Sequence, residues 1–205
     1  MISYQQTQVF IRACRNYRLE SLLILAITTS ARQSELLGLT WDNVDLETGE
    51  INIRQALQKI EGQPTLVEPK TSRSKRTVAL TDIAVGSLRR HHVAQIKERM
   101  YLGAGWNNKF NLVFTTPTGT PLDKDNIIKR ELSPTYRAAE LSTKLTLHDL
   151  RHIAASLVLG KGVSIPTVSD MLGNADAATT PRVYAHAIPG AQREAAIALN
   201  RALAE

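Results

Sequence analysis

Five side chains in this 205-residue chain have the chemistry needed to exchange a phosphate ester without a metal ion. They are Arg32, Lys70, His148, Arg151 and Tyr184. Arginine presents a planar fork of donors that matches phosphate oxygens, and two such forks offset the charge that develops on a pentacoordinate phosphorus. A tyrosine has a pKa of about 10, so its oxygen needs cationic neighbours to attack near neutral pH. The set predicts phosphoryl transfer, with the lysine as general acid.

The string His-Asp-Leu-Arg-His holds two members of this set. His148 and Arg151 are three residues apart, which on a helix places them on one face, where they can converge on one anion. His148 and His152 also have the four-residue spacing of helical zinc ligands, but Asp149 stands where the zinc-protease motif has glutamate. A third ligand is not obvious, although His186 could serve, so a metal site is the minor interpretation. We expect neither a metal ion nor another cofactor.

Each of these residues also has an ordinary structural interpretation. Arg32 and Lys70, taken singly, are typical of solvated surface cations. His148 is compatible with a hydrogen-bonded core histidine, and Tyr184 with a core aromatic whose hydroxyl is anchored. Glu35 is expected to orient a neighbour rather than to transfer a proton. Taken jointly, the five residues favour the functional interpretation.

Capping residues and apolar periodicity predict that helices position most of these side chains. The predicted helices cover residues 3–17, 19–29, 30–38, 82–100, 123–132, 133–141, 147–159, 164–173 and 191–203. The segment 19–29 is almost wholly apolar, which indicates a buried helix. Ser30 is expected to cap the next helix, and Arg32 would then lie in its first turn.

Alternating apolar residues predict a few short strands. The strand-like segments are 50–56, 65–67 and 76–80, and turns at 59–63 and 70–75 connect them. These segments indicate one small three-stranded antiparallel sheet, with a further short strand expected at 111–114. The predicted fold class is α+β, a mainly helical domain with a small sheet.

The chain is basic, with a formal charge of +6 at pH 7 and a pI near 9.6, which favours a polyanionic partner without identifying one. The basic residues between positions 70 and 92 are Lys70, Arg73, Lys75, Arg76, Arg89 and Arg90, and Asp82 is the only acid there. Such a run alone is typical of a solvated surface. Residues suited to phosphate chemistry nearby make nucleic acid the better interpretation.

Length and composition narrow the class of protein further. A hydrophobic content of 43% is enough to form a core in one large domain or two small ones. No apolar run reaches the roughly 18 residues of a membrane span, and the opening residues lack the features of a secretory signal. Cys14 is the only cysteine, so an internal disulfide is excluded and a reducing cytoplasm is the expected compartment.

Five strings in the sequence resemble the catalytic domain of the tyrosine recombinases, or phage integrases. One such string arises by chance in many helices, whereas five in the family's order across nearly the whole chain form a specific signal. They are Ala31-Arg32-Gln33-Ser34-Glu35-Leu36, Glu68-Pro69-Lys70-Thr71, His148-Asp149-Leu150-Arg151-His152, Leu172-Gly173 and Tyr184-Ala185-His186. The resemblance implies the tyrosine recombinase catalytic fold over residues 1–205.

The resemblance also implies a role for each residue. Arg32 and Arg151 would hold the scissile phosphate, and His148 would bond to it and assist proton transfer. Lys70 would protonate the leaving 5′ oxygen, while Tyr184 would attack and remain linked as a 3′-phosphotyrosine. Because this ester conserves the bond energy, the reaction needs neither ATP nor a metal ion.

Asn174 departs from the family pattern, which usually has His or Trp directly after Leu-Gly. The asparagine amide can still donate a hydrogen bond to a phosphate oxygen, but it cannot titrate near pH 7. The alternative function is therefore a catalytically weakened DNA-binding module of the same fold. A topoisomerase-like enzyme is a more distant alternative, because those larger enzymes surround DNA with more protein than this chain has.

The resemblance implies double-stranded DNA as the partner. Candidate contacts to DNA are Arg73, Lys75, Lys124 and Lys129. Family members usually carry a helical core-binding domain before the catalytic one, and we expect this chain to lack it. The alanine-rich segment 191–205 is a candidate helix for exchange between protomers, and the resemblance implies a monomer in solution that assembles into a tetrameric synapse on DNA.

Overall fold

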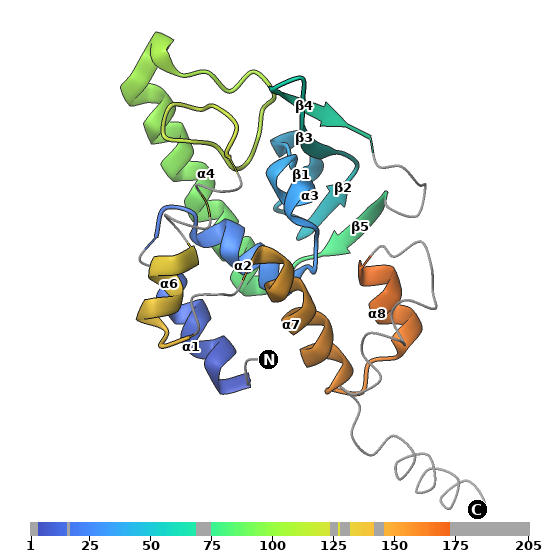
Figure 1. Ribbon diagram of the computed structural model, residues 1–205. Helices are drawn as coiled ribbons and strands as arrows, with labels where there is room; N and C mark the ends of the chain where they lie inside the picture. Colours follow the sequence, from blue (N-terminus) through green and yellow to red (C-terminus); the bar gives the residue numbers. More distant parts are fainter. Residues whose placement is uncertain are drawn as a thin grey trace, which may run out of the picture.

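The computed structural model describes residues 4–15, 17–68, 75–123, 127, 132–141 and 146–172. Helices dominate this part of the chain (Figure 1). The α-helices are α1 (Tyr4–Cys14), α2 (Glu20–Thr28), α3 (Gln33–Leu37), α4 (Asp82–Leu102), α6 (Ser133–Ala138), α7 (Leu147–Leu159) and α8 (Ile165–Leu172). Short 3-10 turns follow α3 and α4, namely η1 (Trp41–Asn43) and η3 (Gly103–Gly105). None of the described helices is long and apolar enough to cross a membrane.

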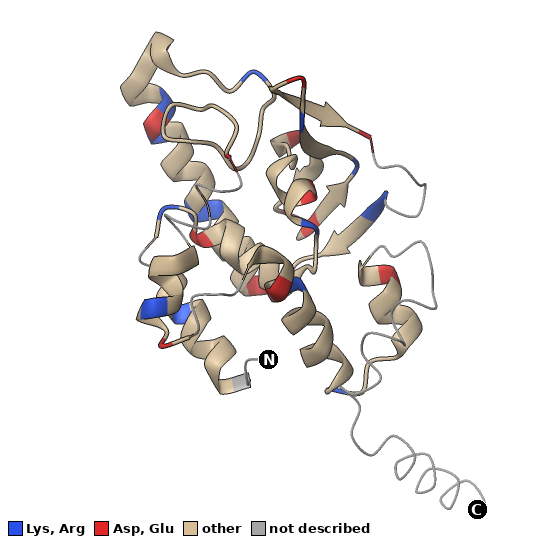
Figure 2. Cartoon of the chain, viewed as in Figure 1, with Lys and Arg blue, Asp and Glu red and all other residues tan. Residues whose placement is uncertain are grey.

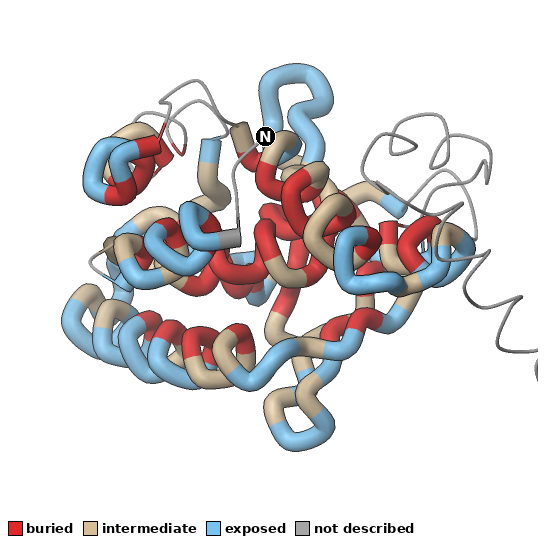
Figure 3. The backbone as a smooth tube through the Cα atoms, turned by 90° about the horizontal axis from the view of Figure 1, so that it is seen from below, coloured by how far each residue is buried: buried red, intermediate tan, exposed pale blue. Residues whose placement is uncertain are grey.

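Helix α2 forms the centre of the core. Its residues from Ser21 to Ile27 are all buried, and it contacts α1, α3, α4 and α7. Figure 3 shows buried stretches on the sides where these helices face one another and exposed stretches on their outer sides. The helix predicted at 19–29 is confirmed as buried, because a helix that is apolar all round is stable only where other elements surround it.

Two small antiparallel sheets lie beside the helices. The strands β1 (Val44–Asp45), β2 (Glu50–Ile53) and β5 (Arg76–Ala79) form a three-stranded sheet in the order β1-β2-β5. The strands β3 (Ala56–Ile60) and β4 (Gln63–Val67) form a separate hairpin. Its two-residue turn has φ of 49° at Glu61 and 80° at Gly62, and positive φ at both positions is what a type I′ turn requires. The predicted α+β class is confirmed.

The predicted membership of the sheet is wrong in one respect. The segment 65–67 pairs with β3 only, and β2 pairs directly with β5, so the predicted strand 50–56 is divided between two sheets. Gly38 permits this arrangement, because a Cβ atom there would lie 2.6 Å from the backbone nitrogen of Leu57. The start of β3 therefore passes against the end of α3, an approach that only glycine permits.

The predicted helix boundaries agree closely with the structure in several places. Helix α7 has the predicted limits, and the Thr81 side chain caps α4 by accepting from the backbone nitrogen of Ala84. The strand predicted at 111–114 is reduced to a single bridge between Thr40 and Leu112. Most of the predicted helix 123–132, and all of 191–203, lie outside the described residues.

Candidate active site

Arg32 begins the helix that carries the first candidate motif. It is the N-cap of α3, and its backbone N–H donates to Glu35 Oε2 at 2.8 Å, while its side chain donates from Nη1 to Glu35 Oε1 at 2.8 Å. The prediction that Ser30 caps this helix is wrong. Ser30 has φ of 54°, in the left-handed region, whereas an N-cap residue has extended backbone. The helix starts instead at Arg32, where the Glu35 carboxylate accepts from the backbone N–H of the N-cap residue.

Glu35 links Arg32 to Arg76, which the sequence analysis named only as a member of the basic run. Its side chain is 4% exposed, and its Oε2 accepts from Nη2 of Arg76 at 2.9 Å. Burial by itself raises the pKa of this carboxyl, but the hydrogen bond and charge of Arg76, with the contacts of Arg32, outweigh it and hold the pKa below its usual range. Glu35 is therefore an orienting anion between two cations, as expected.

The alternation of β5 is the signal that could have revealed Arg76. Successive residues of a strand point to opposite faces, so Arg76 shares a face with Val78, which is 7% exposed. An arginine on the core face of a strand needs a buried partner. What the sequence does not provide is the identity of that partner, Glu35, on an element far away in the chain.

Arg151 is the most enclosed of the candidate catalytic residues that the structure describes, at 4% exposed. From α7 its Nη1 donates to the carbonyl of Ser30, and its Nη2 donates to the carbonyl of Leu172 at 2.7 Å. The left-handed backbone of Ser30 is thus associated with a carbonyl that bonds to Arg151. Because Ser30 lies two residues before Arg32, one guanidinium connects the start of α3 with the end of α8.

The end of α8 is held by a second arginine as well. Arg76 Nε donates to the carbonyl of Met171 at 3.2 Å, next to the residue that Arg151 contacts. In consequence α3, β5, α7 and α8 converge on one cluster of two arginines and one carboxylate, with Arg32 at its edge. Arg32 retains a side-chain exposure of 39%.

His148 lies in the first turn of α7, which is fixed by a capping box. Thr146 N–H donates to Asp149 Oδ2 at 2.6 Å, and the Asp149 backbone N–H donates to Thr146 Oγ1 at 3.3 Å. His148 is exposed, and its Nε2 lies 2.9 Å from Nε2 of His152. Among the described residues no group of three His, Cys, Asp or Glu side chains is placed to hold a metal ion.

The structure therefore brings three predicted residues to one region. Arg32 and Arg151 are connected through Ser30, and His148 shares the face of α7 on which Arg151 lies. Their roles stay predictions. The remaining predicted residues that lie outside the described part of the chain are Lys70, Asn174 and Tyr184 for catalysis, and Arg73, Lys124 and Lys129 for DNA contact.

In the described part of the basic run between positions 70 and 92, the positive charges are compensated by nearby carboxylates. Its described cations each pair with a carboxylate: Lys75 with Glu68, Arg76 with Glu35, Arg89 with Glu47 and Arg90 with Glu20. Figure 2 also shows acidic and basic residues close together on α4. The four described cations of the run are thus distributed over structural and surface ion pairs, and the exposed ones among them remain candidates for contact with a polyanion.

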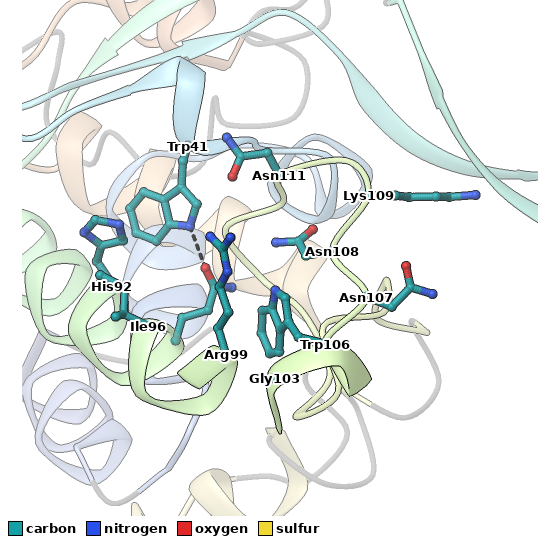
Figure 4. A pocket seen from close by; sticks show the side chains of 11 residues that line it. Trp41, His92, Ile96, Arg99, Gly103, Trp106, Asn107, Asn108, Lys109 and Asn111 are labelled. Atoms are coloured by element: carbon teal, nitrogen blue, oxygen red, sulfur yellow. Dashed lines mark hydrogen bonds between the residues drawn. The ribbon is translucent and has the colours of Figure 1, made fainter. Parts of the chain in front are cut away.

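A pocket of about 450 Å³ opens beside the carboxyl-terminal half of α4 (Figure 4). Trp41 and Arg99 are among the residues that line it, and Trp41 Nε1 donates to Gln95 Oε1 at 2.7 Å. None of the described candidate catalytic residues lines this pocket. It is separate from the candidate site, so Arg99 provides a control cation outside that site.

Glu35→Gln is expected to destabilise the protein more at neutral pH than in acid. A group whose pKa is lowered by folding stabilises the native state above its unfolded pKa, about 4.3, and this contribution disappears as the pH falls through the folded pKa. Removing one charge of this buried cluster should cost roughly 3 kcal/mol. Denaturant unfolding at pH 7 and pH 3 measures the difference in the free energy of unfolding.

Glu47→Gln, which changes an exposed ion pair, is the matched control and should have no effect. Equal losses at both pH values would contradict the ionic explanation.

Comparison with known proteins places the chain in a family. Residues 1–189 match the Phage integrase family, and the chain belongs to that family. It is 30% identical over 203 residues to the Tyrosine recombinase XerC-like protein of Caldanaerobacter subterraneus subsp. tengcongensis, covering 92% of this chain and 50% of that protein. It is also 30% identical over 176 residues to the ICEBs1 integrase of Bacillus subtilis, covering 86% and 47%. The chain spans about half the length of the curated relatives it matches.

Solved structures show the same fold. The Tn1549 transposon integrase, solved in complex with circular intermediate DNA, has a TM-score of 0.78 at 22% identity, covering 97% of this chain and 66% of that one. The crystal structure of XerA recombinase gives 0.73 at 23% identity, covering 94% and 62%. At these identities the likeness establishes the fold alone, and it confirms the predicted tyrosine recombinase catalytic fold.

Proposed function

We propose that this chain is the catalytic part of a site-specific DNA recombinase or integrase that cuts and rejoins DNA through a 3′-phosphotyrosine. The observation that carries the proposal is the position of Arg151, whose guanidinium connects α7 to Ser30, beside Arg32. Two arginines on adjacent elements are what a clamp on a pentacoordinate phosphate requires. Membership of the phage integrase family supports the same function.

The proposed reaction balances without a metal ion or ATP. The oxygen of Tyr184 attacks the phosphorus and passes its proton to His148, and the bond from phosphorus to the 5′ oxygen breaks as Lys70 donates a proton to that oxygen. Arg32 and Arg151 offset the negative charge on the phosphorane, and His148 bonds to the phosphate and assists the proton transfer. A 5′ hydroxyl from a partner strand then attacks the phosphotyrosine and reverses the step.

A nicked suicide substrate tests the function directly. After cleavage the short fragment that bears the 5′ hydroxyl diffuses away, so an active enzyme stays covalently attached to DNA and migrates as an adduct on a denaturing gel. The alternative function, a weakened DNA-binding module, is suggested by Asn174. Such a module would shift the duplex on a native gel and form no adduct on any substrate.

Lys75→Gln is expected to weaken the salt dependence of DNA binding. Lys75 pairs with Glu68 at 2.8 Å, but both side chains are largely exposed, so a phosphate can replace the carboxylate at little cost. One lost phosphate contact should reduce the slope of log K against log salt by about 0.9. Binding titrations of one duplex at several salt concentrations measure this slope. Lys97→Gln, which changes an exposed lysine on α4, is the control. If both variants changed the slope equally, Lys75 would not be a specific contact to DNA.

Double-stranded DNA is the proposed partner, and the cytoplasm the proposed compartment. The DNA-bound structure of the Tn1549 integrase, which shares this fold, supports the choice of DNA.

We expect a monomer in solution and a tetramer on DNA, in which the segment 191–205 exchanges between protomers. Native-gel shifts with one-site and two-site duplexes distinguish independent from cooperative binding.

A further inference from the structure

Two histidines of α7 form a close contact that the proposed reaction does not yet use. Nε2 of His148 and Nε2 of His152 are 2.9 Å apart, and the ring centroids are 4.5 Å apart with the rings almost perpendicular. Two nitrogens at this distance have room for one hydrogen between them, so one ring donates and the other accepts. The direction of this hydrogen bond therefore determines which nitrogen of each ring carries a proton.

The surroundings of His152 favour its neutral form. Burial lowers the pKa of His152, the nearby His148 and Arg151 lower it further, and only Asp149 acts in the opposite direction. The Asp149 carboxylate is also engaged in the capping box with Thr146. A neutral imidazole offers one donor and one acceptor, so His152 is able to accept a hydrogen bond near neutral pH.

We propose that His152 is a positioning residue whose Nε2 accepts the Nε2–H of His148, leaving Nδ1 of His148 as the nitrogen that exchanges protons at the DNA phosphate. The inference rests on the proposed function for the role of His148, but the hydrogen bond itself does not. His152 then carries its own proton on Nδ1. The pair takes up one proton in total, at Nδ1 of His148, and releases it from the same atom.

The opposite direction of the hydrogen bond would not serve the reaction. If His152 donated from its Nε2, the lone pair on Nε2 of His148 would be occupied and the proton of His148 would sit on Nδ1. His148 could then donate a hydrogen bond but could not accept a proton while the contact lasts. With His148 as donor, its Nδ1 can act both as acceptor and, once protonated, as donor.

Nitrogen-15 NMR of the histidine-labelled chain tests the hydrogen bond without any need for activity. We expect a scalar coupling between the two Nε2 nuclei, with His148 protonated at Nε2 and His152 at Nδ1. Because burial lowers the pKa of His152, the coupling should persist to a lower pH than an ordinary histidine acceptor would allow. Absence of the coupling, or a proton on Nε2 of His152 in its place, would overturn the inference.

Kinetics of covalent capture test the positioning role. His152→Leu should slow capture by roughly 10-fold at pH 7, a part of the ~10²–10⁴-fold that proton transfer contributes. His152→Gln, whose amide oxygen can accept from His148 and cannot titrate, should restore most of the rate. His92→Leu, a half-buried histidine of α4, should leave the rate unchanged.

The NMR and capture experiments together distinguish failure of the inference from failure of the proposed function. If the unmodified chain captures no DNA, the proposed function fails while the NMR result still decides the hydrogen bond. If capture proceeds and His152→Leu equals the wild type, His152 has no positioning role. A slow but fully folded His152→Leu variant, together with recovery in His152→Gln, supports it.

Discussion

Tyr184→Phe is expected to abolish covalent capture of a nicked duplex while leaving DNA binding nearly unchanged. The substitution removes one hydroxyl, and with it the oxygen that forms the bond to phosphorus. A water molecule that attacked in its place would cut the DNA without leaving the protein attached. Denaturing gels measure the adduct, and native gels measure binding of the same substrate.

Two described tyrosines serve as matched controls for this experiment. Tyr136 is fully buried and stacks on Phe10 with 5.4 Å between ring centroids, and burial raises the pKa of its hydroxyl. Tyr101 is 91% exposed on α4. Tyr136→Phe and Tyr101→Phe should both retain capture. If either control lost the adduct and Tyr184→Phe retained it, Tyr184 would not be the nucleophile.

Arg151→Ala is expected to reduce capture by more than about 100-fold, the scale of losing a preorganised donor to a developing oxyanion. It should also lower the melting temperature, because the buried carbonyls of Ser30 and Leu172 lose the donor that satisfies them. Two such losses correspond to a decrease of roughly 5–10 °C for a chain of this size. Thermal unfolding and capture rates on the folded fraction measure the two effects separately.

Three further arginine variants define what Arg151 contributes. Arg151→Lys keeps the charge, but a single ammonium group cannot replace a fork that bonds in two directions, so most of both losses should remain. Arg32→Ala should give a similar loss of capture with less loss of stability, since its side chain is partly exposed. Arg99→Ala, at the separate pocket, should change neither quantity. A normal capture rate in Arg151→Lys would contradict the proposal that the Arg151 guanidinium holds the scissile phosphate.

Much of the fold could be predicted from local patterns. The limits of α7 follow from a capping threonine, an apolar periodicity and a terminal glycine at position 160, all of which act within a few residues. The burial of α2 follows from its uniformly apolar sequence. Both features depend only on residues that are neighbours in the chain, so a single sequence is enough to predict them.

The errors arise where a distant contact overrides the local pattern. Ser30 has the residue type of a helix cap, but its carbonyl bonds to Arg151, 121 positions away in the chain. The segment 50–56 alternates like one strand, yet its two ends pair with different strands, β2 with β5 and β3 with β4, and β3 starts against Gly38. The ion pair between Arg76 and Glu35 could not be predicted for the same reason, because the two residues lie on elements far apart in the chain. Likewise, the assignment of Lys70, Asn174 and Tyr184 rests on resemblance and chemistry, because they lie outside the described residues.

The arginine contacts to α8 have a consequence for how this part of the protein can evolve. Arg76 and Arg151 bond to main-chain carbonyls of Met171 and Leu172, and every amino acid supplies such a carbonyl. Side chains on the outer face of α8 are therefore free to diverge between relatives without loosening the attachment. A one-residue insertion within the helix is different, because it would rotate its last turn by about 100° and advance it by about 1.5 Å. Natural variation in α8 should consequently consist of substitutions at constant length.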